Sequence, residues 1–249
     1  MKKKKGASHL GFILSFVIFI TFVLFVYTTL EPTLKIRGDK QPVIDSMKKA
    51  LIENFEVNST IITIVNASQV SSQNCIILNG IIGNGNNQID SSDADNLKIK
   101  SSDGENFYYE EQSSDLEIGT WNPTDLAEDG FLLKIYYSNE IAKDSGDSGS
   151  SCAAAPYSIK LWKEKRQVFE SKIISIMGQY ETDYEQMKAD FNFPDGNEFI
   201  FSFELSDGTI LEPSGINIPS TDIYAATFPV EYLDDEVNSQ IGFLTIKVW

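Results

Sequence analysis

Residues 11–30 read GFILSFVIFITFVLFVYTTL and contain no charged side chain. An α-helix rises about 1.5 Å per residue, so a helix of this length reaches about 30 Å, close to the hydrocarbon thickness of a bilayer. A cleaved secretory signal has a shorter apolar core that is followed by small residues, whereas this run ends in Tyr27-Thr28-Thr29-Leu30. The sequence therefore predicts a retained transmembrane helix over residues 7–31.

Charged residues flank this run on both sides. Lys2–Lys5 form a cluster with no acidic neighbour before it, and basic residues mixed with acidic ones follow it from Lys35 onward. Basic flanks stay in the cytoplasm, which favours a cytoplasmic leader over residues 1–6. The sequons at Asn58 and Asn66, candidate glycosylation sites, favour an external position for the rest of the chain. We expect a single-pass protein of the cell membrane, with the lipid bilayer as a partner.

The rest of the chain is strongly acidic. The sequence has 36 Asp+Glu against 20 Lys+Arg and a formal net charge of -16. Such a surface repels phosphate backbones, so nucleic acid is not an expected partner. The single histidine, His9, precedes the acidic part, which therefore lacks the imidazole of Ser-His-Asp and Cys-His nucleophiles and of common metal sites. We expect no enzyme, no cofactor and no metal.

The two cysteines, Cys75 and Cys152, are too few for a structural zinc site of the common kind. In an exported domain their best use is one disulfide that closes a long loop, which a chain-entropy argument credits with about 4 to 5 kcal/mol. Two unrelated buried thiols are the alternative. The Gly/Ser/Asp-rich stretch over 143–151 cannot build a core, and we expect a flexible insert there.

A neck over 32–40 leads into an acidic domain over 41–249. Residues 41–55 place Val43, Met47, Leu51, Ile52 and Phe55 on one face of a helix. The predicted fold class is α+β: an N-terminal transmembrane helix followed by a mostly antiparallel, β-rich extracytoplasmic domain with two short helices. The second helix is expected over 181–191. Two hairpins are expected, one over 158–173 that turns at 164–166 and one over 198–211 that turns at Asp207-Gly208. The other expected strands are 59–65, 75–78, 97–100, 107–110, 131–137, 223–232 and 242–249.

The first thirty residues resemble the class III signal of type IV prepilins and pilin-like proteins, archaeal ones in particular. The matching features are Lys2–Lys5, Gly6, and an apolar helix that follows without a polar spacer. The resemblance implies that a prepilin peptidase cleaves after Gly6, so that Ala7 becomes the amino terminus and the apolar helix stays on the mature subunit. Gly11 stands at the fifth mature position, where the family usually has glutamate. Segments 184–196 and 241–249 also look similar to archaeal single-anchor pilin-like proteins.

Small residues lie on one side of the apolar helix. Ser8, Gly11 and Ser15 follow each other at spacings of three and four residues, a pattern that lets a second helix approach closely. The helix of another copy, or of another pilin-like subunit, is the expected partner. An ordinary helix surface without a partner is the alternative.

Two groups of acidic residues are weak candidates for chemistry. The residues Asn86, Asn87, Asp90, Asp93 and Asp95 offer oxygen ligands, but their order does not match a calcium-binding EF-hand loop. The pairs and runs Glu110-Glu111 and Asp234-Asp235-Glu236 contain the carboxylates that a glycosidase needs, but their sequence positions imply no common cleft.

The sequence therefore favours a structural or interaction subunit, pilin-like and without catalysis, whose apolar helix holds an acidic domain outside the cell. One alternative is a cell-surface binding module, an adhesin or receptor for glycan or peptide. A third possibility, a membrane-tethered carboxylate hydrolase, has less support. Exposed aromatic side chains would favour the binding module; the candidates are Tyr108, Tyr109, Trp121, Tyr136 and Tyr137.

Overall fold

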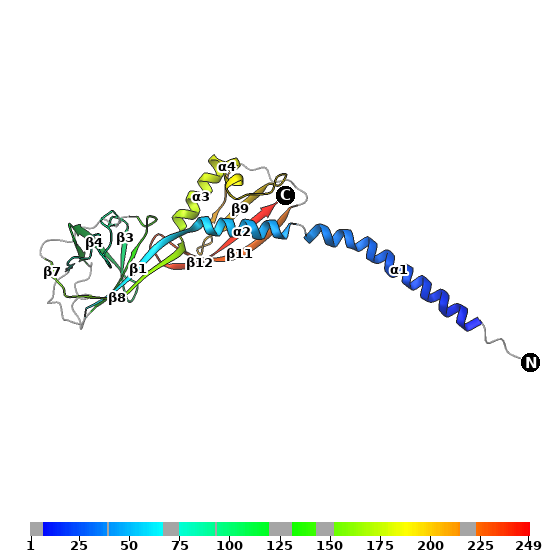
Figure 1. Ribbon diagram of the computed structural model, residues 1–249, viewed down its shortest axis with the longest axis horizontal. Coiled ribbons are helices and arrows are strands. Elements are labelled where there is room, and N and C mark those ends of the chain that lie inside the picture. Colours follow the sequence, from blue (N-terminus) through cyan, green and yellow to red (C-terminus); the bar gives the residue numbers. More distant parts are fainter. Residues whose placement is uncertain are drawn as a thin grey trace, which may run out of the picture.

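The computed structural model describes residues 7–38, 40–66, 75–92, 94–119, 131–142, 152–214 and 223–249. Helix α1 (Ala7–Gly38) projects away from a two-lobed body that holds the other described helices and strands (Figure 1). Helix α2 (Gln41–Phe55) lies at the near end of that body and continues directly into strand β1 (Glu56–Asn66). The α+β class with antiparallel sheets, predicted from the strand and helix patterns, is confirmed.

The prediction of a transmembrane helix over residues 7–31 is wrong. Within the described part of the chain, no helix is both long enough and apolar enough to cross a bilayer. The helix that does form, α1, also differs from the predicted one in its bounds, because it continues through Pro32 and the basic stretch beyond it to Gly38.

The large-sheet lobe is built on an eight-stranded sheet in the order β7-β2-β5-β4-β3-β6-β1-β8. Neighbouring strands are antiparallel, except that β2 and β7 are parallel. Side chains alternate between the two faces of a strand, and the inward set, such as Ile62 and Ile64 of β1, forms one buried cluster. The other strands are β2 (Cys75–Leu78), β3 (Leu97–Ser101), β4 (Asn106–Gln112), β5 (Asp115–Gly119), β6 (Phe131–Tyr137), β7 (Ala153–Ala154) and β8 (Ser158–Val168).

The helical lobe packs helices on a four-stranded antiparallel sheet in the order β10-β9-β12-β11. On α2 the buried residues are Ile44, Met47, Leu51 and Phe55, so the predicted helix is confirmed, with Ile44 on the buried face and Val43 and Ile52 at its margins. The remaining elements are α3 (Glu170–Thr182), α4 (Tyr184–Asp190), β9 (Phe199–Glu204), β10 (Ile210–Leu211), β11 (Tyr224–Leu233) and β12 (Ser239–Val248).

Two long strands join the lobes. β1 and β8 pair from Glu56↔Val168 to Val65↔Ser158, and their near ends connect to α2 and α3 of the helical lobe. A small buried cluster of Ile141, Phe169, Leu233 and Val237 lies at this junction. The lobes therefore have separate main cores and share a continuous pair of strands.

The predicted hairpin over 158–173 is wrong. Residues 158–168 form one strand, because β8 pairs with β1 along its whole length and the charged stretch at 164–166 faces solvent within that strand. Residues from 170 onward form α3, which buries Ile173, Ile176, Met177 and Tyr180 at helical spacing. The described part of the domain thus contains three helices where two short ones were predicted.

The hairpin over 198–211 is confirmed as β9 and β10, with Gly208 at a φ of +87 in its turn. The predicted strands at 75–78 and 131–137 match β2 and β6. Strand β5 was missed because Asp115-Leu-Glu-Ile-Gly119 is short and half polar, and β7 was missed because it has two residues. The predicted helix over 181–191 is shorter in the structure, since Asp183 ends α3 and begins α4.

Candidate functional site

The described side chains of α1 form an exposed apolar surface. Every side chain from residue 11 to residue 25 is exposed, including Phe12 at 75%, Phe22 at 63% and Phe25 at 68%. We call residues 11–27 the α1 surface. Exposed apolar patches of more than a few hundred Å² mark interaction sites, so this surface is the first candidate functional site.

Part of the predicted small-residue edge lies on the α1 surface. Gly11 and Ser15 are both exposed, and a Cβ atom built on Gly11 would meet no atom within 4 Å. Ala7 and Ser8 lie within the first turns of α1, but their side chains are outside the described set, and the predicted cleavage residue Gly6 lies outside the described residues. The edge is therefore available for close helix contact at Gly11 and Ser15.

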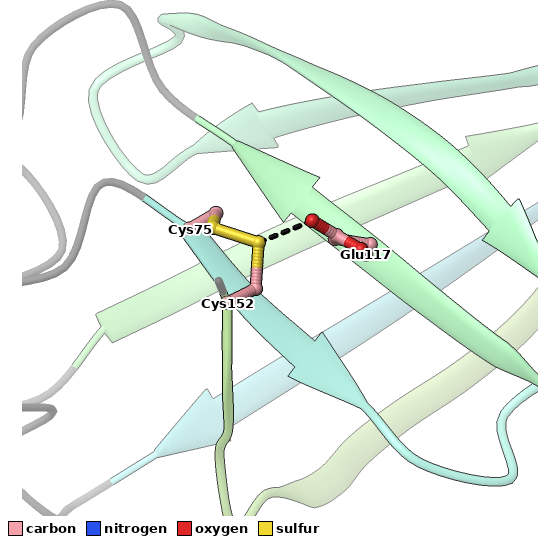
Figure 2. Close-up of side chains that lie close together, drawn as sticks. All are labelled: Cys75, Glu117 and Cys152. Atoms are coloured by element: carbon pink, nitrogen blue, oxygen red, sulfur yellow. Dashed lines mark hydrogen bonds between the residues drawn. A yellow bond between two sulfur atoms is a disulfide. The ribbon is translucent and has the colours of Figure 1, made fainter. Parts of the chain in front are cut away.

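Cys75 and Cys152 form the predicted disulfide, with their Cα atoms 4.9 Å apart (Figure 2). It ties the start of β2 to the residue that precedes β7. The carboxylate of Glu117, on β5, points at the sulfur of Cys152, and its other oxygen accepts a hydrogen bond of 2.5 Å from Gln112 Nε2. Among the described His, Cys, Asp and Glu residues, these two cysteines and Glu117 are the group whose ligand atoms lie within metal-binding reach of one another.

The helical lobe contains a pocket of about 320 Å³ where α3 and α4 meet the end of the sheet. Its walls combine aromatic rings and carboxylates, and the rings of Tyr180 and Tyr184 lie 4.8 Å apart between centroids. Trp249 is held beside β9 by two backbone hydrogen bonds with Glu198, of 2.9 and 3.0 Å. The lining residues are Tyr180, Glu181, Tyr184, Glu198, Phe199, Ser214 and Trp249.

Hydrogen bonds engage the hydroxyl groups of this pocket. Tyr184 donates to Glu198 Oε2 at 2.6 Å and accepts from the backbone N–H of Phe199 at 3.1 Å, while Tyr180 donates to the carbonyl of Phe199. Burial raises the pKa of both tyrosines, so they stay neutral hydrogen-bond donors at physiological pH.

The carboxylates of the pocket are ionised. Burial alone would raise the pKa of Glu198, but the hydrogen bonds from Tyr184 and Lys188 and the charge of Lys188, 2.9 Å away, hold that pKa below its ordinary value. Glu181 accepts hydrogen bonds from Ser214 N–H at 2.7 Å and from its Oγ at 2.8 Å, which lower the pKa of Glu181. The pocket therefore offers acceptors and aromatic faces, and it suits a ligand rich in donors.

Four of the five aromatic residues predicted as a binding platform lie in the described part of the chain, and these four are buried or half-buried. Tyr109 is buried, and its hydroxyl accepts a hydrogen bond from Leu97 N–H at 3.2 Å. Tyr108, Tyr136 and Tyr137 are half-buried, and Trp121 lies outside the described residues. Because side chains alternate along β4 and β6, Tyr109 points into the core, and the four described tyrosines form no fully exposed aromatic face.

Within the acidic run 234–236, Glu236 pairs with Lys98 across the lobe junction, while Glu110 is exposed on β4. Lys98 Nζ lies 3.0 Å from Glu236 Oε2, and Lys100 Nζ donates to Asn238 Oδ1 at 2.6 Å. Burial lowers the pKa of Lys100, against the opposing charges of Asp234 and Glu236. This arrangement assigns the run a structural role between β3 and the turn of β11 and β12.

Four of the five residues weighed for calcium lie in the described part of the chain. Asp90 accepts hydrogen bonds from Ser92 N–H and Oγ, both at 2.9 Å, and these bonds lower the pKa of Asp90. Asn86, Asn87 and Asp95 are exposed, and Asp93 lies outside the described residues. Within the described chain, no three acidic side chains here come within metal-binding reach.

The two sequon asparagines both lie on β1, but only the side chain of Asn58 is described. Asn58 is exposed on β1, opposite Arg166 of β8. Asn66 is the last residue of β1, and its side chain is outside the described set. Glycosylation at both residues stays a prediction.

Comparison with known proteins gives no relative: no family model, no curated protein and no solved structure matches the chain. The surfaces described above are therefore the basis on which function can be inferred. Sequence reasoning had missed the pocket, because Tyr180 of α3, Glu198 before β9 and Trp249 after β12 lie far apart in the sequence. The only local signal was the i, i+4 spacing of Tyr180 and Tyr184.

Proposed function

We propose that this chain is a structural or interaction subunit, pilin-like in organisation, that associates with other copies through the α1 surface and carries its acidic two-lobed body at the cell surface. The exposure of every side chain from 11 to 25 on a helix that projects from the body carries this proposal. Apolar surface gains about 25 cal/mol for each Å² that is removed from water, so a helix of this kind is strongly driven to find an apolar partner.

A second copy of α1 suits this surface for two reasons. It presents no charge between residues 11 and 27, so nothing on it selects a charged partner. Gly11 and Ser15 lie exposed on one side, where small residues allow two helix backbones to approach closely.

The body of the protein is suited to display. With a formal net charge of -16, the bodies of neighbouring copies repel each other, which favours association through α1 over association through the lobes. The disulfide is typical of domains that work in an oxidising compartment, which supports a position outside the cytoplasm.

Oxidative cross-linking in cells tests the proposal. Both native cysteines are in the disulfide, so Ser15→Cys adds a single free thiol to the full chain. We expect Ser15→Cys to form cross-linked dimers in good yield and Val17→Cys, about 200° around the helix, to form few. Gly11→Ile in the Ser15→Cys chain should lower the yield without disturbing the monomer, because the site is open.

Two outcomes would contradict the proposal. Absence of cross-linked dimers from both cysteine variants would show that copies do not meet through α1. Equal yields from both variants, unchanged by Gly11→Ile, would show contact without the small-residue edge. The matched control is Ile241→Ser, which removes an exposed apolar side chain from β12 and should leave the yield of the Ser15→Cys chain unchanged.

The pocket favours a second function, binding of a glycan at the cell surface. Aromatic faces stack on sugar rings, and the ionised Glu181 and Glu198 accept hydrogen bonds from sugar hydroxyls. Saturation-transfer NMR with a panel of neutral mono- and disaccharides tests it. Binding should disappear in Trp249→Ala and persist in Phe243→Ala, an exposed aromatic outside the pocket, and lack of any signal from the panel would exclude this function.

A further inference from the structure

Strand register places three chemically reactive groups on one face of the large sheet. β2 and β5 pair with Cys75 opposite Gly119 and Ile77 opposite Glu117, so Cys75 and Glu117 project from the same face. The core residues of these strands, such as Ile76 and Ile118, project from the opposite face. Cys152 reaches this outer face from the residue before β7 (Figure 2).

Glu117 is unusual because it is buried beside sulfur. Its exposure is 5%, and its described hydrogen-bond donor is the uncharged amide of Gln112. The second contact of its carboxylate is with Cys152 Sγ, and a disulfide sulfur has no proton to donate. A buried carboxylate normally has a strong donor or a cation as its partner, and the disulfide supplies neither. The dithiol form would supply a donor, and a metal ion would supply a cation.

We propose that the reduced protein binds one thiophilic divalent cation, with Zn²⁺ as the natural candidate, through Cys75 Sγ, Cys152 Sγ and a carboxylate oxygen of Glu117. The three ligand atoms lie within 4.8 Å of one another, and breaking the S–S bond frees the two sulfurs to move apart to the roughly 3.8 Å that separates ligands in a tetrahedral zinc site. Thiolate sulfur and carboxylate oxygen are both common zinc ligands, and three protein ligands leave the fourth position for water or another ligand.

The disulfide and the metal exclude each other, so the redox state selects between them. A dithiol reductant transfers two electrons to the S–S bond, becomes a disulfide itself, and leaves Cys75 and Cys152 as thiols. Binding of Zn²⁺ then displaces the two thiol protons to solvent, since the thiolate is the form that binds metal. Reoxidation to the disulfide removes two of the three ligands and releases the ion.

Spectroscopic titration of the full chain with Co²⁺, followed by competition with Zn²⁺, tests this proposal. After reduction with a phosphine under nitrogen, we expect one Co²⁺ per chain, a thiolate-to-cobalt charge-transfer band, and displacement by Zn²⁺. The oxidised chain should show neither the stoichiometric binding nor the band. Circular dichroism of the reduced chain reports whether its fold persists.

Glu117→Gln is the decisive variant because it leaves both cysteines in place. We expect it to weaken Co²⁺ binding by about tenfold or more, as loss of a ligand or its support does at metal sites. The matched control is Glu164→Gln, which changes an exposed carboxylate on β8, at the opposite edge of the sheet from β7, and should bind as the parent does. The proposal would be overturned if the reduced protein bound no metal. It would also be overturned if the Glu117→Gln variant bound Co²⁺ as tightly as the parent, because the metal would then be bound by the thiols alone.

Discussion

The helical lobe and the large-sheet lobe each bury one face of a sheet, but they cover it differently. In the helical lobe α2, α3 and α4 lie on the four-stranded sheet, and large rings such as Phe55, Phe199 and Phe201 fill the space between helix and strand. In the large-sheet lobe, no described helix residue belongs to the core, which consists mainly of Ile and Leu side chains from the strands themselves. That lobe also carries the disulfide.

The difference shows where each lobe is vulnerable. The helical lobe depends on a few aromatic contacts between its helices and its sheet, such as that of Phe55 with Phe201. The large-sheet lobe must bring together strands far apart in sequence, so the loss of chain entropy on closing long loops is the main free-energy cost of folding it. A cross-link between residues 77 apart in sequence acts directly on that entropy.

The largest effect should come from the cross-link. Replacing both Cys75 and Cys152 by Ser removes the constraint on the unfolded chain and should lower the free energy of unfolding by about 4 to 5 kcal/mol. Urea unfolding followed by hydrogen exchange should place the loss in β2, β5 and β7. Equal loss of protection in β9 and β12 would contradict the view that the lobes have separate cores.

The next effect concerns the aromatic core of the helical lobe. Phe201→Ala should lower the free energy of unfolding by about 3 to 5 kcal/mol, because the fully buried ring leaves a cavity between α2 and β9. Phe243→Ala, an exposed ring on β12, is the matched control and should change stability by less than about 1 kcal/mol. Similar losses for the two variants in urea unfolding would show that burial does not decide the effect.

The coupling between the lobes should be weaker than either core. Glu236→Gln leaves the buried ammonium of Lys98 without its 3.0 Å ion pair and should cost about 1 to 2 kcal/mol. Asp235→Asn, the exposed neighbour in the same turn, should cost less than about 0.5 kcal/mol. If thermal unfolding cannot distinguish the two variants, the junction is not held by this pair.

The smallest effect is on the pH dependence of the helical lobe. The folded pKa of Glu198 is below its unfolded value of 4.5, so its contribution is complete above about pH 4.5 and is lost as the pH falls through the lower folded pKa. Glu198→Gln should therefore reduce the acid sensitivity of Tm between about pH 5 and pH 2. Glu185→Gln, an exposed change on α4, should show the same dependence of Tm on pH as the parent. If Glu198→Gln also showed the parent's dependence, Glu198 would not contribute to acid sensitivity.

Sequence patterns predicted the elements wherever the local signal was strong. The heptad-like spacing of α2, the alternating β9 and the Asp207-Gly208 turn all formed as expected, because their residues favour one local structure whatever surrounds them. The charged stretch at 164–166 was read as a turn, and it is a strand because β1 lies beside it. Pairing with a distant strand can override local preference, and no short window of sequence contains that information.

An uncharged apolar segment over residues 11–27, an acidic body, and two cysteines able to form one disulfide can all be read from the amino-acid sequence. The tertiary structure alone decided that Glu117 lies against that disulfide, that Trp249 meets Tyr184 at one pocket, and that Lys98 pairs with Glu236. The physical reason is distance along the chain. Composition and periodicity indicate local structure over a few residues. These contacts join residues 35 to 138 positions apart and form only when the strands of the sheets have paired.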